Sequence, residues 1–250
     1  MAYIVLDVWS ISEEPFTVYR YIESITEKYM PREEKICTAT EAVTEIRSGD
    51  RIMVGSFGNS GYPEALVDAV AQSEVTDLTI ISNDLGSPGI GLGRFLANRQ
   101  VKALIGNYYN WNPDVAAAKN CGAIEVTLVP QGTFAEAIRA AGVGIPAFYV
   151  ATGVGTALTE GKPTAVFDRR TYVMERAIQA DVALIRARKA DTLGNLSYYK
   201  TARNFNPLMA MAARLTIVEV DEIVPAGELD PECIVTPHIF VDMLVEKVKR

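Results

Sequence analysis

The sequence is poor in the residues from which metal and redox sites are built. It has three cysteines, Cys37, Cys121 and Cys233, far apart and odd in number, and no Cys-x-x-Cys or Cys/His spacing. This pattern predicts no metal site, and it predicts reduced core thiols in a cytoplasmic protein. The net charge is -7 and no basic run is present, which argues against a nucleic-acid partner.

Long apolar runs are also absent. No run is long enough to span a bilayer, and the N-terminus lacks a basic segment followed by an apolar one, so no membrane association is expected. Hydrophobic residues nevertheless make up 49% of the 250 residues. A chain of this length and composition can bury a sizeable core as one large α/β domain or two small ones.

From residue 38 onward, apolar runs alternate with helical patterns. The expected strands are 51–55, 77–82, 101–106, 123–129, 181–190 and 214–224, and the expected helices are 38–49, 63–72, 91–99, 113–120, 132–142 and 206–213. Residues 148–167 are expected to form a loop or short strands, and 171–180 a strand leading into a helix. The alternation predicts an α/β fold, a mostly parallel open sheet with helices on both faces, in a single domain.

Residues 1–34 stand apart because they are rich in aromatic side chains and precede the regular pattern. They are interpreted as an N-terminal arm, and 35–250 as the domain. An alternative is that translation starts at Met30 and the upstream residues are dispensable.

A glycine loop between an expected strand and helix is the most prominent local feature. Its order, Gly55, Gly58 and Gly61, is G-x-x-G-x-x-G, whereas a dinucleotide fingerprint requires G-x-G-x-x-G. Asp84 follows at a distance suited to a ribose-binding acid, so the match is partial. A nicotinamide-dependent oxidoreductase is therefore disfavoured.

Other catalytic patterns are missing. Residues 155–163 have five residues between the glycines and Pro163 after Lys162, so they are not a P-loop. The single histidine, His238, has apolar neighbours and is interpreted as structural, and no G-x-S-x-G elbow occurs. Residue types alone thus predict only a ligand site at the C-terminal edge of the sheet.

Several segments taken together carry a resemblance. The glycine loop, PQGT at 130–133, GNLSY at 194–198 and ARNFNP at 202–207 occur in the order seen in the α (A) subunit of family I CoA-transferases, of the acetate/butyrate–acetoacetate type. The likeness extends from Thr38 to Val245. It implies the open α/β CoA-transferase fold.

The resemblance implies that the glycine loop binds CoA, which is a substrate rather than a permanently bound cofactor. The loop residues are Gly55, Ser56, Phe57, Gly58, Asn59, Ser60 and Gly61. Ser56 departs from the family pattern, in which a second glycine is usual, and a positive φ there would cost about 1 kcal/mol. N–H groups at the start of the next helix are expected to receive a phosphate or a pantetheine carbonyl. The alternative is a tight turn that only packs well.

The family transfers CoA through a glutamyl thioester, and its nucleophile lies in a Glu-Asn-Gly motif of the β (B) subunit. No Glu-Asn-Gly occurs here, so the resemblance implies half of a heteromer, α2β2 or larger. Gln131 matches a family glutamine that stabilises the oxyanion, or else it satisfies backbone groups at the helix start. Asn83 and Asp84, at the end of a strand, are candidates for the substrate pocket.

The segment 106–114, GNYYNWNPD, departs from the family. Asn107 and Asn110 stand where relatives carry Ser and Gly, and Tyr108, Tyr109 and Trp111 add bulk. Asn107 and Tyr109 are therefore candidate pocket residues, and the aromatic side chains are expected to favour short acids. Alternatively, these aromatic residues pack against the N-terminal arm.

The resemblance thus implies the α subunit of a short-chain acyl CoA-transferase that exchanges CoA between acetyl- or butyryl-CoA and an acid such as acetoacetate. A non-catalytic CoA- or ligand-binding homologue that lacks a partner is the alternative. Ser56 and the altered 106–114 segment would be its marks.

Overall fold

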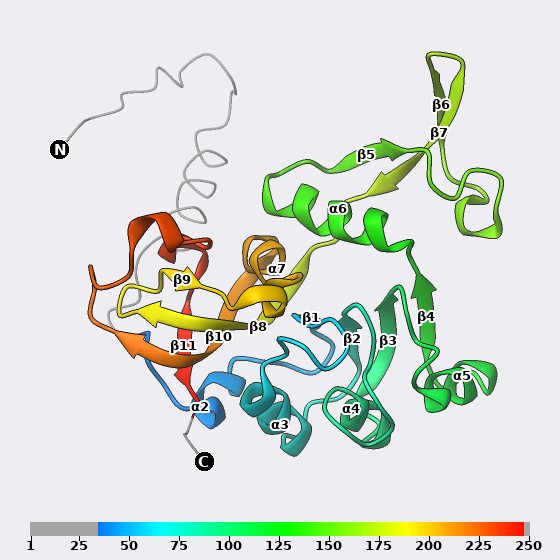
Figure 1. Ribbon diagram of the computed structural model, residues 1–250. Coiled ribbons are helices and arrows are strands. Elements are labelled where there is room, and N and C mark those ends of the chain that lie inside the picture. The colour runs from blue at the N-terminus through cyan, green and yellow to red at the C-terminus, as the bar shows by residue number, and fades with distance from the viewer. Residues whose placement is uncertain (1–34, 248–250) are drawn as a thin grey trace, which may run out of the picture. The chain divides into compact units, whose positions relative to one another are not determined.

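A mostly parallel eight-stranded sheet organises the fold of the computed structural model, which describes residues 35–247 (Figure 1). The strand order is β11-β10-β8-β1-β2-β3-β4, and every neighbouring pair in it is parallel. A short strand, β9, pairs antiparallel with β8. The strands are β1 (Arg51–Val54), β2 (Leu78–Ile81), β3 (Val101–Gly106), β4 (Glu125–Leu128), β8 (Ala180–Asp191), β9 (Leu196–Ser197), β10 (Ala213–Val224) and β11 (Met243–Glu246).

Helices cover both faces of this sheet, as the alternating pattern predicts (Figure 1). One face packs against α2 (Ala39–Val43), α3 (Glu64–Gln72), α4 (Gly93–Ala97) and α5 (Pro113–Asn120). The other packs against α6 (Gln131–Gly142) and α7 (Asn206–Ala212). Two hydrophobic clusters, one on each face, form the core because successive strand residues point to opposite sides.

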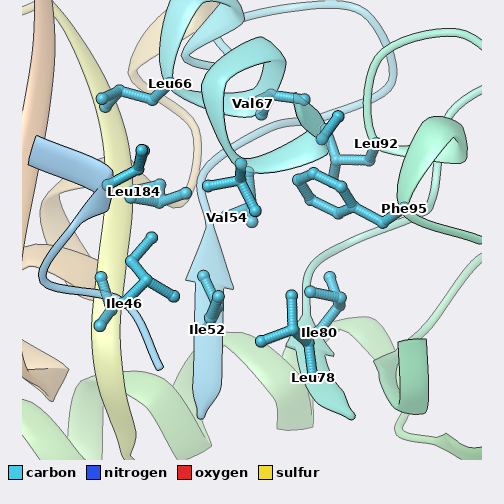
Figure 2. Close-up of a cluster of buried hydrophobic side chains, with 14 of the residues drawn as sticks. Ile46, Ile52, Val54, Leu66, Val67, Leu78, Ile80, Leu92, Phe95 and Leu184 are labelled. Carbon is cyan, nitrogen blue, oxygen red and sulfur yellow. The ribbon is translucent and has the colours of Figure 1, made fainter. Parts of the chain in front are cut away.

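Figure 2 shows how the first face is packed. Leu66 and Val67 of α3 lie over Val54 of β1, and Leu184 of β8 closes one side of the cluster. These four side chains are all fully buried. The apolar face of α3 therefore anchors the helix directly behind the glycine loop.

The first helix confirms the predicted capping box but is shorter than the predicted range of 38–49. Thr38 Oγ1 accepts from the Glu41 N–H at 3.2 Å, and Glu41 Oε2 accepts from the Thr38 N–H at 2.8 Å. These bonds satisfy two N–H groups that would otherwise lack helical partners. The α-helix itself ends at Val43, and turns carry the chain to β1.

A second, three-stranded antiparallel sheet lies between α6 and β8 in the sequence. Its order is β5-β7-β6, from β5 (Ala147–Val150), β6 (Thr164–Phe167) and β7 (Arg170–Arg176), with a 3-10 turn, η1 (Ala157–Thr159), before β6. The prediction of short strands in 148–167 is confirmed. The predicted helix at the end of 171–180 is wrong, because β7 is the central strand and its partners extend it to Arg176.

Two further expectations need correction. The final strand, β11, was not predicted, because Met243–Glu246 is too short to show a periodic pattern and is defined by its pairing with β10. The cysteines are free, as predicted, but they are not core thiols. Cys121 and Cys233 are exposed and Cys37 is half-buried.

The chain reverses its direction of growth across the sheet at β1. Strands β1 to β4 follow one another toward one edge, and β8 then returns to the other side of β1. In open α/β sheets, ligands bind outside the C-terminal ends of the strands at such a reversal. The topology therefore predicts a ligand site at the loop after β1 and the neighbouring end of β8.

The two-cluster core predicts a strong difference between two leucines. Leu104 on β3 is fully buried, whereas Leu193 is half exposed in a turn. We expect Leu104→Ala to lower the free energy of unfolding by about 2–5 kcal/mol, because it leaves a cavity. Leu193→Ala is expected to change it by less than about 1 kcal/mol. Chemical denaturation of the two variants measures both, and equal losses would contradict this account of the core.

Candidate functional site

The glycine loop forms a tight turn directly after β1. The Phe57 and Ser60 backbones donate to each other's carbonyls at 3.0 and 3.1 Å. Gly58 and Gly61 have φ values of 58° and 71°, which favour glycine, but Ser56 has no positive φ. The departure from the family pattern at Ser56 therefore carries no backbone penalty.

Asn206, at the start of α7, holds this loop against β8. Its Nδ2 donates to the Gly61 carbonyl at 3.0 Å, and its Oδ1 accepts from the Arg186 N–H at 2.9 Å. The side chain is fully buried. A Cβ on Gly55 would lie only 1.8 Å from Asn206 Oδ1, so a side chain at Gly55 and this hydrogen-bonded position of Asn206 exclude each other.

Asn204 adds a second contact and connects the loop to α6. Its Nδ2 donates to the Ser60 carbonyl at 3.0 Å. The next residue, Phe205, meets Phe134 of α6 edge-to-face with ring centroids 5.5 Å apart. The ARNFNP segment therefore contacts both the glycine loop and α6, the helix that begins within PQGT.

Asp84 supports the loop from β2. Its Oδ2 accepts from the Gly58 N–H at 2.8 Å and from Asn83 Nδ2 at 2.8 Å, while Oδ1 accepts from the Gly86 N–H at 2.9 Å. The carboxylate is buried. Asp84 thus acts as a support for the loop backbone, because both of its oxygens are engaged by protein donors, and this removes the main feature that suggested a nicotinamide site.

The start of α3 does not offer its N–H groups as expected. Glu219 of β10, fully buried, accepts from the Ala65 and Leu66 N–H groups at 2.6 and 3.3 Å, and Arg186 Nη1 donates to it at 2.8 Å. Burial raises the pKa of Glu219, while Arg186 and the two N–H groups oppose that shift. The expectation that this helix start receives a phosphate is therefore wrong for these two donors, since the protein supplies its own anion.

Buried polar atoms without partners gather at one edge of the sheet. Within residues 35–247, the buried side-chain atoms that lack a hydrogen-bond partner all follow the C-terminal ends of β1 to β4. They are Ser56 Oγ, Asn83 Oδ1, Asn107 Oδ1, Tyr109 OH, Asn112 Nδ2 and Thr133 Oγ1. Buried polar groups in proteins nearly always have partners. Their concentration here marks this edge as the functional one.

The aromatic residues after β3 divide into a buried and an exposed set. Tyr109 is buried, and both its burial and the charge of Asp84 raise the pKa of its hydroxyl far above the usual range. Trp111 lies against Gly58, where a Cβ would be 3.0 Å from its ring, and meets Tyr108 edge-to-face at 5.4 Å. The structure therefore places Tyr109 under the sheet edge and Trp111 beside the glycine loop. The N-terminal arm, the alternative packing partner, lies outside the described residues.

Gln131 is the first residue of α6 and is exposed. Its side chain makes no hydrogen bond to any residue in 35–247, and no side chain caps the start of this helix. The alternative role of satisfying backbone groups thus finds no support in the described residues. Phe134, in the same turn of α6, contacts Phe205 of the ARNFNP segment.

His238 lies in a 3-10 turn, η4 (His238–Phe240), away from these groups in the sequence. Its N–H donates to Asn195 Oδ1 at 3.0 Å, and its ring Nδ1 lies 3.3 Å from the same oxygen. These bonds confirm the structural interpretation of this histidine. Residues 35–247 contain no group of three or more His, Cys, Asp or Glu side chains arranged to hold a metal.

Comparison with known proteins decides the family. The sequence pattern described as Coenzyme A transferase matches residues 36–247. The chain belongs to the coenzyme A transferase family. The A chain of a probable succinyl-CoA:3-ketoacid coenzyme A transferase from Bacillus subtilis (strain 168) is 51% identical over 84% of this chain and 88% of the relative. The alpha chain of the acetate CoA-transferase of Escherichia coli (strain K12) is 46% identical over 84% and 96%.

Solved structures show the same fold. The acyl-CoA transferase YdiF of Escherichia coli O157:H7, in a thioester complex with CoA, matches with a TM-score of 0.75 at 21% identity, over 88% of this chain and 48% of YdiF. This chain thus spans about half the length of YdiF. Glutaconate coenzyme A-transferase from Acidaminococcus fermentans also matches with a TM-score of 0.75, at 24% identity, over 85% and 75%. The predicted CoA-transferase fold is confirmed.

Local sequence pattern does not reveal which residues hold the glycine loop. ARNFNP is a mark of the coenzyme A transferase family, and it also carries both Asn204 and Asn206. Glu219 and Arg186, which hold the start of α3, have no local signature because they form a charged pair on two neighbouring strands. Within residues 35–247, no helix is long and apolar enough to cross a membrane.

The close contact between the glycine loop and Asn206 predicts that two glycines respond differently to the same substitution. We expect Gly55→Ala to lower the free energy of unfolding by about 1–3 kcal/mol, because Asn206 must leave its buried hydrogen bonds. Gly132, in the first turn of α6, has no positive φ, and a Cβ added there would meet no atom within 4 Å. Gly132→Ala is expected to be neutral or stabilising by up to about 1 kcal/mol. Denaturation curves compare the two variants, and an unchanged midpoint for Gly55→Ala would contradict the close contact between Asn206 and the glycine loop.

Proposed function

We propose that this chain is the α subunit of a heteromeric short-chain acyl CoA-transferase. The observation that carries the proposal is the row of buried, unpartnered polar atoms at the C-terminal edge of β1 to β4, beside the glycine loop and the start of α6. Such a row suits a ligand or a partner chain that completes the hydrogen bonding. The relatives, whose names mark them as A or alpha subunits, support the division into two kinds of chain.

The chemistry requires a carboxylate nucleophile that this chain does not supply in the family's motif. A glutamate of the partner attacks the acyl-CoA thioester, expels CoA thiolate and forms a mixed anhydride. The thiolate then attacks the glutamyl carbonyl, releases the first acid and leaves a glutamyl-CoA thioester. The second acid reverses these steps. No Glu-Asn-Gly occurs in the sequence, so the nucleophile is assigned to a β subunit, in an α2β2 or larger assembly.

In this scheme the chain forms the side of the active site that faces the glutamate of the β subunit. Gln131 donates from its exposed amide to the oxyanion that develops during attack. The loop from Gly55 to Gly61 binds CoA, and Asn83, Asn107 and Tyr109 border the acyl pocket. Asp84 holds the loop in place.

The proposed acids are short. Acetoacetate is the expected acceptor, and acetyl- or butyryl-CoA the expected donor. The names of the relatives include both acetate and succinyl-CoA:3-ketoacid transferases, so succinyl-CoA belongs in the donor panel.

Activity is expected only from the complex. We expect the chain co-expressed with a candidate β subunit to co-purify and to transfer CoA from an acyl-CoA to acetoacetate, and the chain alone to show no turnover. The measurement is acetoacetyl-CoA formation by each preparation with acetyl-, butyryl- and succinyl-CoA. Turnover by the chain alone would refute the assignment of the nucleophile. A complex that binds CoA without turnover for any donor would favour the non-catalytic homologue.

Substitution of Gln131 tests its proposed role as the donor that stabilises the oxyanion. We expect Gln131→Ala to lower kcat on the order of 100-fold with little change in KM, because the lost donor acts mainly in the transition state. Gln72→Ala is the matched control, since Gln72 is an exposed glutamine at the opposite end of α3 from the glycine loop. If kcat fell equally in both variants, or in neither, the oxyanion role would be wrong.

A further inference from the structure

Two cations flank one tyrosine ring next to the glycine loop. The Arg188 guanidinium carbon lies 4.9 Å from the Tyr199 ring centroid, and Lys200 Nζ lies 5.1 Å from it. Half of Tyr199 is exposed. The ring holds both cations by cation–π attraction, so their remaining N–H groups can face a ligand.

These residues border cavities on two sides of Ser60. One, of about 350 Å³, is lined by Arg188 and Tyr199 together with Ser60 and Gly61. The other, of about 520 Å³, is lined by Phe57, Ser60, Lys200, Arg203 and Asn204. The cationic residues therefore line the same two cavities as Ser60 of the glycine loop.

The local charge contrasts with that of the whole chain, which is -7. Arg188, Lys200 and Arg203 are exposed, and none of them forms an ion pair within residues 35–247. The two acids of the first cavity are neutralised, because Arg186 pairs with Asp221 and Lys247 pairs with Glu64. A positive surface is thus left beside the loop.

The segment that carries Lys200 and Arg203 has a defined backbone. Lys200 and Asn204 have φ values of 48° and 26°, which non-glycine residues seldom adopt. The Ala202 carbonyl accepts from Asn204 Nδ2 and Asn206 Nδ2, both at 3.0 Å. The asparagines that hold the glycine loop therefore hold this segment as well, and they keep Lys200 and Arg203 beside the loop.

We propose that Arg188, Lys200 and Arg203, with Tyr199 orienting the first two, bind the phosphate-bearing nucleotide end of CoA. This inference rests on the proposed function and deepens it. The glycine loop takes the adjoining part of the same ligand. With Ala65 and Leu66 already engaged by Glu219, the side-chain cations supply the positive charge that the start of α3 does not.

The test compares two acyl donors on the complex with the β subunit. We expect the triple variant Arg188→Gln/Lys200→Gln/Arg203→Gln to raise KM for acetyl-CoA by about tenfold or more, because charge-assisted phosphate contacts are lost. S-acetylpantetheine has no nucleotide end, so its kinetic constants should change by less than about twofold. Tyr199→Ala, which removes the ring that orients two of the cations, is expected to raise KM for acetyl-CoA alone, and Tyr199→Phe, which keeps the ring, is expected to raise it less.

The chain offers a matched control. Arg170 lies 5.7 Å from the Tyr172 ring centroid on β7 and is also exposed, without an ion pair in residues 35–247. Arg170→Gln should leave both KM values unchanged. Thermal unfolding of all variants should match wild type, because the substituted side chains are exposed.

Two outcomes would overturn the proposal. One is an unchanged KM for acetyl-CoA in the triple variant, and the other is an equal rise for both donors, which would place the effect at the loop or thioester end. If the wild-type complex shows no turnover, the proposed function fails but this inference is still tested by calorimetric titration with adenosine 3′,5′-bisphosphate. Binding that is lost in the triple variant and kept in Arg170→Gln supports it, and absence of binding by wild type refutes it.

Discussion

The close approach of the glycine loop to Asn206 is the constraint on which the rest of the site depends. Asn206 uses both ends of its amide, one on the Gly61 carbonyl and one on the Arg186 N–H, and it occupies the space that a side chain on Gly55 would need. Because the amide is fully buried, losing either hydrogen bond would leave a buried polar group with neither a protein nor a water partner. The loop, the end of β8 and the start of α7 are therefore fixed together.

Charge placement follows from the same arrangement. Glu219 reaches from β10 to the first turn of α3 and is held by Arg186, so the positive end of that helix is satisfied inside the protein. The loop N–H of Gly58 is likewise taken by Asp84. Backbone donors that many α/β folds turn toward phosphate are thus partly used for structure, which leaves exposed side-chain cations to meet an anionic ligand.

The site also contains buried polar atoms that lack hydrogen-bond partners within the described residues. Ser56, Asn83, Asn107 and Thr133 come from the ends of four successive parallel strands and the helix that follows. A stable fold does not gain from burying such atoms without partners. Their presence at one edge fits a chain whose site is completed by another molecule, in keeping with the family's division between subunits.

Local pattern by itself determined the alternation of strands and helices, the parallel sheet and the glycine loop, because burial on both faces produces apolar runs and tight turns require glycine. Resemblance pointed to Gln131 and the CoA-transferase family. Only the tertiary structure decided that β7 is a strand throughout, that Met243–Glu246 pairs with β10, that Asn204, Asn206 and Asp84 hold the loop, and that Glu219 holds the start of α3. These outcomes depend on contacts between residues far apart in sequence, such as Gly61 with Asn206, which no local pattern encodes.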